Sequence, residues 1–206
     1  MNITLINYIV IKLNLIPLKD DINDYLLFSE ILDFDNKIVS KKASELSKGL
    51  NDIQKAKSIY EFVRDKIDHS SDIYNNEITF KASDVLNKGH GICFAKSHLL
   101  AALLRCEKIP AGFCYQKVFI GSEKILHGLN GVFLNEKWFR LDARGNVGGI
   151  NANFSINEEK LAYKIKNEFD GVDYPHVYSK PIPEIIKIFK NYSALDEVIN
   201  QILYQL

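Results

Sequence analysis

Cysteine is scarce in this sequence, and the few cysteines form no recognisable ligand or disulfide set. The chain of 206 residues contains three, Cys93, Cys106 and Cys114. Their odd number, and the lack of a Cys-x-x-Cys pair or of Cys/His pairs at zinc spacing, argue against a disulfide framework and a structural zinc site. We therefore expect a reducing compartment, the cytoplasm, and no metal or other cofactor.

An excess of charge of either sign is also missing. Lys and Arg total 26, Asp and Glu total 26, and the sequence pI is about 7.0. Without a positive field, the chain is not expected to bind nucleic acid or a membrane surface. The apolar run 3–17 lacks a basic start and a small-residue cleavage site, and it is too short to span a bilayer. The sequence leaves the oligomeric state open.

The remaining composition is that of an ordinary globular protein, with 47% hydrophobic and 25% charged residues. No internal repeat or low-complexity linker divides the chain, so we predict that residues 1–206 form a single domain. Helical and alternating patterns both occur, and the predicted class is α+β. Asn51 followed by Gln54 predicts a capping box at the start of an amphipathic helix.

Periodicity and turn signals give an order of elements along the chain. The predicted helices are 20–32, 40–46, 52–66, 83–86 (capped by Ser83), 92–106, 158–165, 183–192 and 193–204. The predicted strands are 3–16, 113–120, 125–134 and 137–142, with extended chain at 174–183 and loops at 69–77 and 142–153. The last three long strands form an antiparallel meander, and the Gly/Asn-rich loop that follows them is a candidate to line a site.

The stretch 88–110 (KGHGICFAKSHLLAALLRCEKIP) is the most informative part of the sequence. Gly89 and Gly91 let the chain turn sharply before a largely apolar helix, which Pro110 stops. Cys93 falls in the first helical turn, where free N–H groups and the helix dipole favour a thiolate. Such a cysteine is either a nucleophile or a small buried hydrophobic residue, and this stretch alone leaves both interpretations open.

A two-residue turn at 135–136 fixes the register of the last hairpin. The opposed pairs are then Phe133 with Trp138, Gly131 with Arg140, and Leu129 with Asp142. His127 lies on the same face as Leu129, so His127 and Asp142 become diagonal neighbours about 7–8 Å apart at the backbone. An imidazole and a carboxylate can bridge that gap, whereas a slip of one residue would place them on opposite faces.

These residue types have a known chemistry when they meet. A carboxylate beside an imidazole fixes its tautomer and stabilises the imidazolium, and an imidazole beside a cysteine stabilises the thiolate. Cys93, His127 and Asp142 therefore form a candidate triad. The sequence does not itself show that the helix carrying Cys93 packs beside the two strands.

Three separated motifs resemble the transglutaminase-like superfamily, papain-fold enzymes with a Cys-His-Asp triad. They are GICFAKSHLLAALLRCEKIPA, HGLNGVFLNEKWFRLDA and the upstream IYEFVRDKI, and the likeness covers about 51–149. The resemblance implies a papain-like or transglutaminase core, with a central helix that begins at the nucleophile and packs on an antiparallel sheet, flanked by helices at both termini. It also implies Cys93 as nucleophile, His127 as general base and acid, and Asp142 as the residue that orients His127.

The resemblance implies a cysteine hydrolase acting through a thioester on an amide bond of a peptide or protein substrate. Transfer of a glutamine acyl group to an amine is the alternative; we rank it second because the chain is small and shows no evident calcium site. A non-catalytic binding module that keeps the fold is the third reading. Family members commonly add a side-chain oxyanion donor such as Trp, but the single Trp138 lies between His127 and Asp142, which leaves Tyr74 as the candidate.

The other candidates have competing structural explanations. We expect core positions for Cys106, Cys114 and His98, and surface positions for His69, His90 and His176, with substrate contact as the alternative for His90. Trp138 either shields the His127–Asp142 pair or packs in the core. Arg144 and Asn146 either bind a substrate carboxylate or brace their own loop, and we favour the second.

Overall fold

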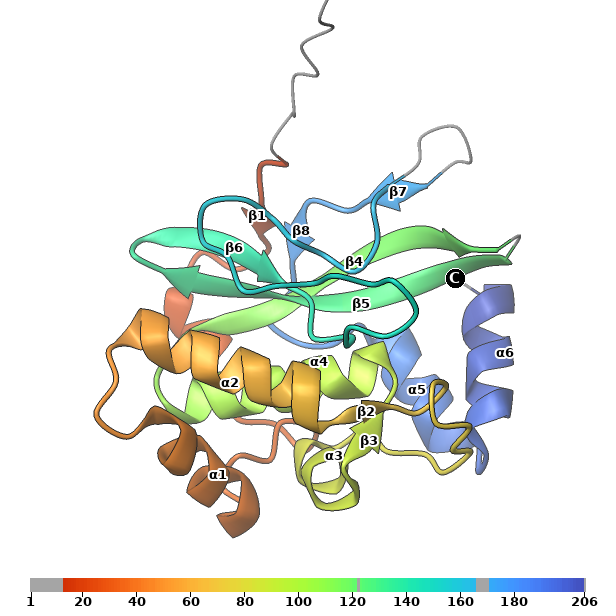
Figure 1. Cartoon of the computed structure of the whole chain (residues 1–206), viewed down its shortest axis with the longest axis horizontal. Coiled ribbons are helices and arrows are strands. Elements are labelled where there is room, and N and C mark those ends of the chain that lie inside the picture. Colours follow the sequence, from red (N-terminus) through yellow and green to blue (C-terminus); the bar gives the residue numbers. More distant parts are fainter. Residues whose placement is uncertain (1–12, 122, 166–170, 206) are drawn as a thin grey trace, which may run out of the picture.

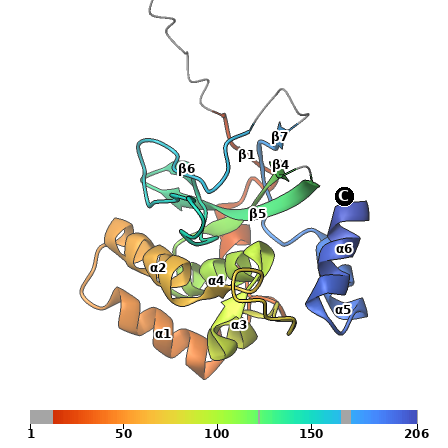
Figure 2. The same cartoon turned by 45° about the vertical axis from the view of Figure 1, so that its right-hand side comes forward.

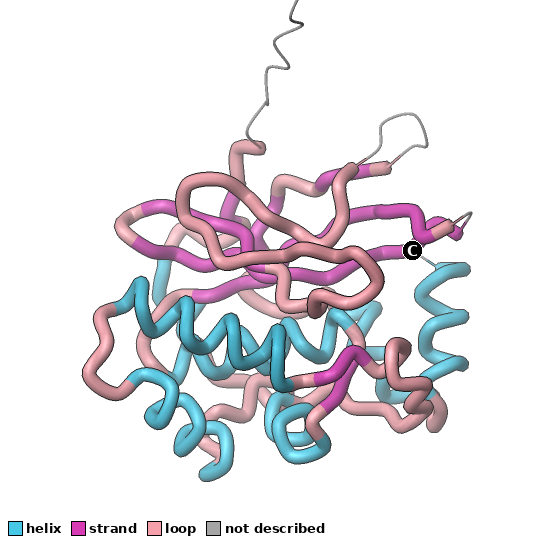
Figure 3. The backbone as a smooth tube through the Cα atoms, viewed as in Figure 1, coloured by secondary structure: helices cyan, strands magenta, loops and turns pink. Residues whose placement is uncertain are grey.

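The computed structural model describes residues 13–121, 123–165 and 171–205 (Figure 1). A layer of helices lies against one face of a curled antiparallel sheet, and two further helices close one end (Figures 1 and 2). Figure 3 shows the same division, with the long strands in the upper half and most of the helices below them. This arrangement confirms the predicted α+β class and the expected core around a central helix.

The secondary structure contains six α-helices, one 3₁₀ helix and eight strands in the described residues. The helices are η1 (Ile22–Leu26), α1 (Lys37–Ser47), α2 (Asp52–Lys66), α3 (Ala82–Lys88), α4 (Cys93–Cys106), α5 (Pro183–Asn191) and α6 (Leu195–Gln205). The strands are β1 (Ile16–Pro17), β2 (Asp68–His69), β3 (His90–Gly91), β4 (Ala111–Ile120), β5 (Glu123–Leu134), β6 (Lys137–Leu141), β7 (Val172–Asp173) and β8 (His176–Val177). Among the described residues, no helix is long and apolar enough to cross a lipid bilayer.

The main sheet has the strand order β6-β5-β4-β7, and its neighbours are antiparallel. Two short parallel pairs stand apart from it, β1 with β8 and β2 with β3. In the last hairpin Phe133 pairs with Trp138 and Gly131 with Arg140. The register predicted from the two-residue turn is therefore confirmed.

Helix α4 is the centre of the molecule. Every residue from Cys93 to Arg105 is buried, as an apolar run on all sides of a helix predicts. The helix contacts β4 and β5 on one side and α1, α2 and α3 on the other. Glycine allows the close approach to the sheet, because a Cβ atom at Gly128 would lie 2.7 Å from Cδ1 of Phe94. Asn130 locks the same contact by donating from Nδ2 to the carbonyl of Ser97 at 3.0 Å.

Helix α2 forms as its sequence predicts. The Asn51 side chain accepts from the Gln54 N–H, and the Gln54 side chain accepts from the Asn51 N–H, so the capping box is complete. The helix runs from Asp52 to Lys66 and buries Ile59 and Val63, among others, against the core. Its end leads directly into β2, which brings this part of the chain beside the start of α4.

Two predicted helices near the N-terminus differ from the structure. The helix expected at 20–32 is wrong beyond a single 3₁₀ turn at Ile22–Leu26, because the Leu27 carbonyl accepts from Nη1 of Arg105 at 2.7 Å rather than from a helical N–H. The helix expected at 40–46 begins earlier, at Lys37, where the Asn36 side chain caps it. Of the strand expected at 3–16, residues 3–12 lie outside the described residues and only the end forms β1.

Two more local predictions are wrong for tertiary reasons. Ser83 does not cap α3 but lies inside it, and both its N–H (3.0 Å) and its hydroxyl (2.5 Å) donate to the Asp33 carboxylate. Residues 158–165 form no helix, because their backbone groups have distant partners. The Ala162 N–H donates to Oδ2 of Asp142 at 2.9 Å, and the Lys160 carbonyl accepts from the N–H of Asn153 at 2.9 Å.

Candidate active site

Cys93 is the first residue of α4, and its side chain is only 9% exposed. Ile92 is the N-cap residue and has no side-chain group with which to cap the helix. The first intrahelical hydrogen bond runs from the Lys96 N–H to the Ile92 carbonyl at 2.9 Å. The N–H groups before Lys96 therefore have no acceptor within the helix and can receive an anion.

Two glycines shape the entry to this helix in different ways. Gly89 ends α3 in the left-handed conformation, at a φ of 75°, which glycine adopts without a steric penalty. Gly91 has no positive φ but is needed for space, because a Cβ atom there would lie 2.9 Å from the Cβ of Ala95. The predicted sharp turn is thus made by Gly89, while Gly91 lets β3 pass close to α4.

His127 and Asp142 meet where the predicted register puts them. Nε2 of His127 lies 2.8 Å from Oδ2 of Asp142, and each side chain is 1% exposed. His127 comes from β5, and Asp142 follows the last residue of β6. The pair therefore has a fixed geometry, shielded from water.

The Cys93 side chain lies near enough to His127 to affect the charge of the ring. Because Nε2 faces Asp142, the ring atom available to Cys93 is Nδ1. Burial lowers the pKa of His127, but the charge of Asp142, the hydrogen bond that His127 makes to Asp142, and the interaction with the Cys93 side chain outweigh burial and raise that pKa to about 10. The imidazole is thus held in its charged form between a thiol and a carboxylate.

Besides His127, three groups hold the Asp142 carboxylate and backbone. Oδ1 accepts from the N–H of Arg144 at 3.1 Å, Oδ2 accepts from the N–H of Ala162 at 2.9 Å, and the carbonyl accepts from the hydroxyl of Tyr60 at 3.0 Å. Burial raises the pKa of Asp142, but the charge and hydrogen bond of His127 and the two N–H groups outweigh it, and the pKa is lowered. The carboxylate therefore remains ionised although it is buried.

Three side chains from two loops cover the His127–Asp142 pair. The Tyr163 ring meets the His127 ring edge to face at a centroid distance of 4.9 Å. The Tyr163 hydroxyl accepts from Nε of Arg144 at 3.2 Å, and the Arg144 guanidinium binds both oxygens of Asp72. Loops that follow β2 and β6 thus meet above the imidazole.

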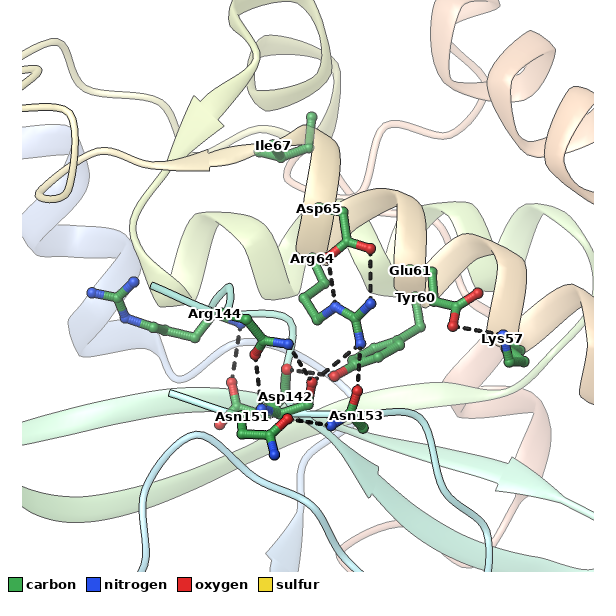
Figure 4. Close-up of polar contacts among 12 residues, drawn as sticks. Lys57, Tyr60, Glu61, Arg64, Asp65, Ile67, Asp142, Arg144, Asn151 and Asn153 are labelled. Atoms are coloured by element: carbon green, nitrogen blue, oxygen red, sulfur yellow. Dashed lines mark hydrogen bonds and ion pairs between the residues drawn. The ribbon is translucent and has the colours of Figure 1, made fainter. Parts of the chain in front are cut away.

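Helix α2 anchors the loop that follows Asp142 (Figure 4). Nη1 of Arg64 donates to the Ala152 carbonyl and to Oδ1 of Asn153, both at 3.1 Å, while Nε and Nη2 bind Asp65. Asn146 closes the same loop by exchanging hydrogen bonds with the backbone of Ala152 at 3.1 and 2.8 Å. This bracing is the explanation that we favoured for Arg144 and Asn146.

Lys96 fastens the helix start to the surrounding loops. Its side chain is 1% exposed, and Nζ donates to the carbonyls of Ile67, Arg144 (3.2 Å) and Arg64 (3.4 Å). Burial, together with the charge of Arg144, lowers the pKa of Lys96 to about 8 despite nearby carboxylates. A lysine within an apolar helical run is a signal that such a role exists, but its partners depend on the fold.

Other residues of this site were not recognisable from the sequence. Ala162 acts through its backbone, which no side-chain pattern reveals, and Tyr163 lies in a segment predicted as a helix. Tyr60 lies on the buried face of α2, where the hydroxyl of a tyrosine requires a partner. The sequence thus predicted the central residues and missed those that support them.

Several histidine assignments from the sequence are corrected here. His90 is buried rather than exposed, with its ring 3.0 Å from Oγ of Ser70 and 3.4 Å from Glu77. His69 is half-buried rather than exposed, and its ring atom Nδ1 is buried. His98 is a core histidine as predicted, with Nδ1 2.7 Å from the Phe80 carbonyl.

The remaining candidates lie away from the triad. Tyr74 is 95% exposed, so it is not the oxyanion donor for which it was a candidate. Trp138 packs against Tyr25 and Phe133, at centroid distances of 4.7 and 5.3 Å, which favours its role in packing. Cys114 is buried as expected, and burial raises the pKa of its thiol to about 12.

Two cavities open elsewhere on the described surface. One, of about 450 Å³, lies beside Trp138 on β6, and the other, of about 440 Å³, lies beside Ile31 and the start of α5. Neither is lined by a member of the triad. The described residues contain no group of three or more histidine, cysteine or acidic side chains placed to hold a metal ion.

Comparison with known proteins gives one family and several similar folds. Residues 40–143 match the family model of the transglutaminase-like superfamily, a span of just over half of the chain that includes Cys93, His127 and Asp142. A candidate cysteine protease from Cytophaga hutchinsonii has a TM-score of 0.53 and 24% identity, over 65% of this chain and 46% of that chain. At this level of identity, the likeness shows a shared fold alone.

Two further solved structures are more distant. A candidate protease from Parabacteroides distasonis has a TM-score of 0.44 and 14% identity, over 78% of this chain and 32% of that chain. A structure described as a TGase has a TM-score of 0.42 and 17% identity, over 62% of this chain and 35% of that chain. The matched region is thus less than half the length of each of the three solved chains. No curated protein matches the sequence.

Proposed function

This chain belongs to the transglutaminase-like superfamily, and from that membership we propose that it is a cysteine hydrolase cleaving an amide bond in a peptide or peptide-like substrate. The observation that carries the proposal is the position of the His127 imidazole, which lies 2.8 Å from Asp142 and near enough to the Cys93 side chain for the two to affect each other's charge. In the proposed roles, Cys93 is the nucleophile, His127 is the general base and acid, and Asp142 orients His127 and stabilises its charge.

The proposed reaction begins with attack of the Cys93 sulfur on the amide carbon. The C=O electron pair moves onto oxygen, and the N–H of Cys93 at the open helix start donates to that oxyanion. Collapse of the intermediate breaks the C–N bond, and the departing nitrogen takes the proton of the His127 imidazolium. Water then gives a proton to His127 and attacks the thioester, and the second collapse releases the carboxylic acid and the Cys93 sulfur.

The electrostatics support these roles at neutral pH. With a pKa raised to about 10, His127 carries a proton that it can donate to the leaving nitrogen. Asp142 stays ionised because its pKa is lowered. A thiolate at Cys93 would face the imidazolium on one side and the positive end of α4 on the other, and both stabilise a negative charge.

Alkylation by iodoacetamide tests the activated nucleophile. We expect Cys93 to react faster than Cys106 and Cys114, which serve as internal controls, and to keep that advantage at mildly acidic pH. His127→Ala is expected to remove the advantage. The site of alkylation is read by peptide mass spectrometry across a pH series. If Cys93 reacts like an ordinary thiol, and His127→Ala changes nothing, the proposed role of Cys93 is wrong.

A second experiment separates the possible reactions. The protein is incubated with a glutamine-containing peptide and an isotope-labelled primary amine, and the products are weighed by mass spectrometry. Cleavage or deamidation without incorporation of the amine supports hydrolysis. Incorporation of the amine would replace hydrolysis by acyl transfer, and an unchanged peptide with a normally reactive Cys93 would direct the search to other amide substrates. Cys93→Ser is the control for contaminating activity.

A further inference from the structure

His69 presents a buried polar atom that has no partner. It lies on β2, and its Nδ1 has no hydrogen-bond partner among the described residues. Burying such an atom without a hydrogen bond is unfavourable, and groups of this kind in a native structure call for a specific explanation. A ligand that is absent from the structure would provide one.

The position of His69 points to the candidate active site. His69 pairs with Gly91 across the parallel β2–β3 ladder, and Gly91 is two residues before Cys93. The His69 carbonyl accepts from the Asp72 N–H, Asp72 binds Arg144, and Arg144 binds Tyr163, whose ring contacts His127. His69 therefore lies among the groups that surround the candidate triad. None of these neighbours accepts a hydrogen bond from Nδ1.

The surroundings of His69 hold it in place and keep it neutral. The Asp72 N–H donates to the His69 carbonyl at 2.8 Å, and Asp72 is itself bound by Arg144. Burial, followed by the charge of Arg144, lowers the pKa of His69 to about 3, although Asp72 opposes this. At neutral pH the ring is therefore an uncharged imidazole, with one N–H to donate.

Acyl transfer at Cys93 passes through an oxyanion, and the N–H of the His69 ring can donate a hydrogen bond to it. The tetrahedral intermediate carries an oxyanion next to the helix start, and one backbone N–H there leaves room for a second donor. Tyr74 cannot supply it from its exposed position. A neutral donor also suits the site, since it stabilises the oxyanion without competing with His127 for Asp142.

We propose that Nδ1–H of His69 donates a hydrogen bond to the oxyanion formed when Cys93 attacks an acyl carbon. This inference rests on the proposed function, because it requires Cys93 to be the nucleophile. It assigns to His69 a direct contact with the reacting atoms, and it explains why a buried nitrogen has no partner in the free protein. A half-buried histidine that only packs beside β3 would have no such role.

Two reactions of Cys93 distinguish these roles. In acylation by p-nitrophenyl acetate, the sulfur forms a bond to the acetyl carbon, the ester C–O bond breaks, and p-nitrophenolate leaves with the electron pair. This reaction passes through an oxyanion. Alkylation by iodoacetamide displaces iodide from a saturated carbon and forms no oxyanion. A donor to the oxyanion should therefore affect acylation alone.

The experiment compares His69→Phe, which removes the donor, with His69→Gln, which keeps an N–H donor. His176→Phe on β8 is the matched control, since His176 is a half-buried histidine remote from the β2–β3 ladder. For His69→Phe we expect acylation to slow by about 10²- to 10³-fold, while alkylation stays within about twofold of wild type. His69→Gln should recover most of the loss, and His176→Phe should change neither rate.

Each other outcome overturns the inference in a recognisable way. If His69→Phe is acylated as fast as wild type, His69 is not a donor to the oxyanion. If acylation and alkylation fall together, His69 positions Cys93 and the inference is also wrong. If wild-type Cys93 is neither acylated nor unusually reactive in alkylation, the proposed function itself fails, which the first two outcomes would not show.

Discussion

The two regions that meet at the His127–Asp142 pair are built in different ways. On one side, α4 and β5 are regular elements that pack closely, with the Phe94 ring against Gly128 and the Asn130 side chain on the carbonyl of Ser97. On the other side, residues 142–165 have almost no regular structure. They hold the pair through the Ala162 N–H, the Tyr163 ring and the Arg144–Asp72 ion pair.

The difference separates two tasks. Close packing fixes the distance between the cysteine and the imidazole, because a well-packed core tolerates little change in volume. The loop controls charge, because N–H groups aimed at a buried carboxylate keep it ionised. The family match ends at residue 143, which is where the packed region ends and the loop begins. The packed region therefore carries the family likeness, and the loop lies beyond it.

Removing the imidazole between the two regions should have the largest effect. For His127→Gln we expect acylation of Cys93 by p-nitrophenyl acetate to fall by about 10²- to 10⁴-fold, the usual contribution of general acid–base catalysis. The variant keeps a side chain that can hydrogen-bond to Asp142, so circular dichroism should show an unchanged fold. Acylation at the wild-type rate would mean that the sulfur needs no base.

The same variant has a pH signature. The pKa of His127 is raised to about 10 in the folded protein from about 6.5 in the unfolded chain. The stabilisation by its charge is therefore fully present below about pH 6.5 and is lost as the pH rises through about 10. Asp142, with a lowered pKa, contributes above about pH 3.9 and loses its contribution as the pH falls. Urea titrations should show the wild-type advantage over His127→Gln shrinking from pH 7 to pH 10.

A side chain at Gly128 tests the packed region. In Gly128→Val, the new Cβ would lie 2.7 Å from Cδ1 and 3.1 Å from Cε1 of Phe94, so the ring next to Cys93 must move. Overpacking of this kind costs about 1–3 kcal/mol, and we expect a matching loss in the free energy of unfolding and a strong loss of acylation. Combining Gly128→Val with Phe94→Leu should restore part of both. If the single and double variants lose equally, Phe94 is not the source of the strain.

What the sequence predicted follows the same division. The hairpin register and the boundaries of α4 come from local rules, a two-residue turn and an apolar run that ends at Pro110, and both are confirmed. Cys93, His127 and Asp142 could be proposed because they lie on these regular elements. The packing of α4 against β5 came only from the family resemblance.

The residues that were missed depend on contacts between distant parts of the chain. Residues 158–165 have helical composition, yet the Ala162 N–H binds Asp142, 20 residues away. Lys96 reaches the carbonyls of Ile67 and Arg144, and nothing in the apolar run around it names those partners. Such contacts override local propensity, because a buried carboxylate or carbonyl gains more from a donor than a short helix gains from one turn.

The Ala162 N–H gives a test of the loop. Ala162→Pro removes this donor from Oδ2 of Asp142, and hydrogen bonds to charged groups contribute about 1.5–3 kcal/mol. We expect a loss of about 2 kcal/mol in the free energy of unfolding. We also expect the pKa of Asp142 to be higher than in the wild type, so that, as the pH is lowered, the variant loses acylation activity at a higher pH than the wild type does. Ala162→Ser keeps the N–H and is the control. If the acylation rate of Ala162→Pro falls at the same acidic pH as that of the wild type, the loop does not set the charge of Asp142.

The smallest expected effect concerns the outer anchor of the loop. Arg64 binds the Ala152 carbonyl and Asn153 from α2. The surface pair Lys57–Glu61 lies on the same helix, N-terminal to Arg64 (Figure 4). For Arg64→Met we expect a loss of about 1 kcal/mol, faster hydrogen exchange at residues 150–153, and acylation within about threefold of wild type. Lys57→Met is the control and should cost less than about 0.5 kcal/mol, as exposed helix pairs do. If both variants change hydrogen exchange in this loop equally, Arg64 does not anchor it. Residues 150–153 would then be held by Asn146, whose side-chain amide donates to the Ala152 carbonyl and accepts from the Ala152 N–H.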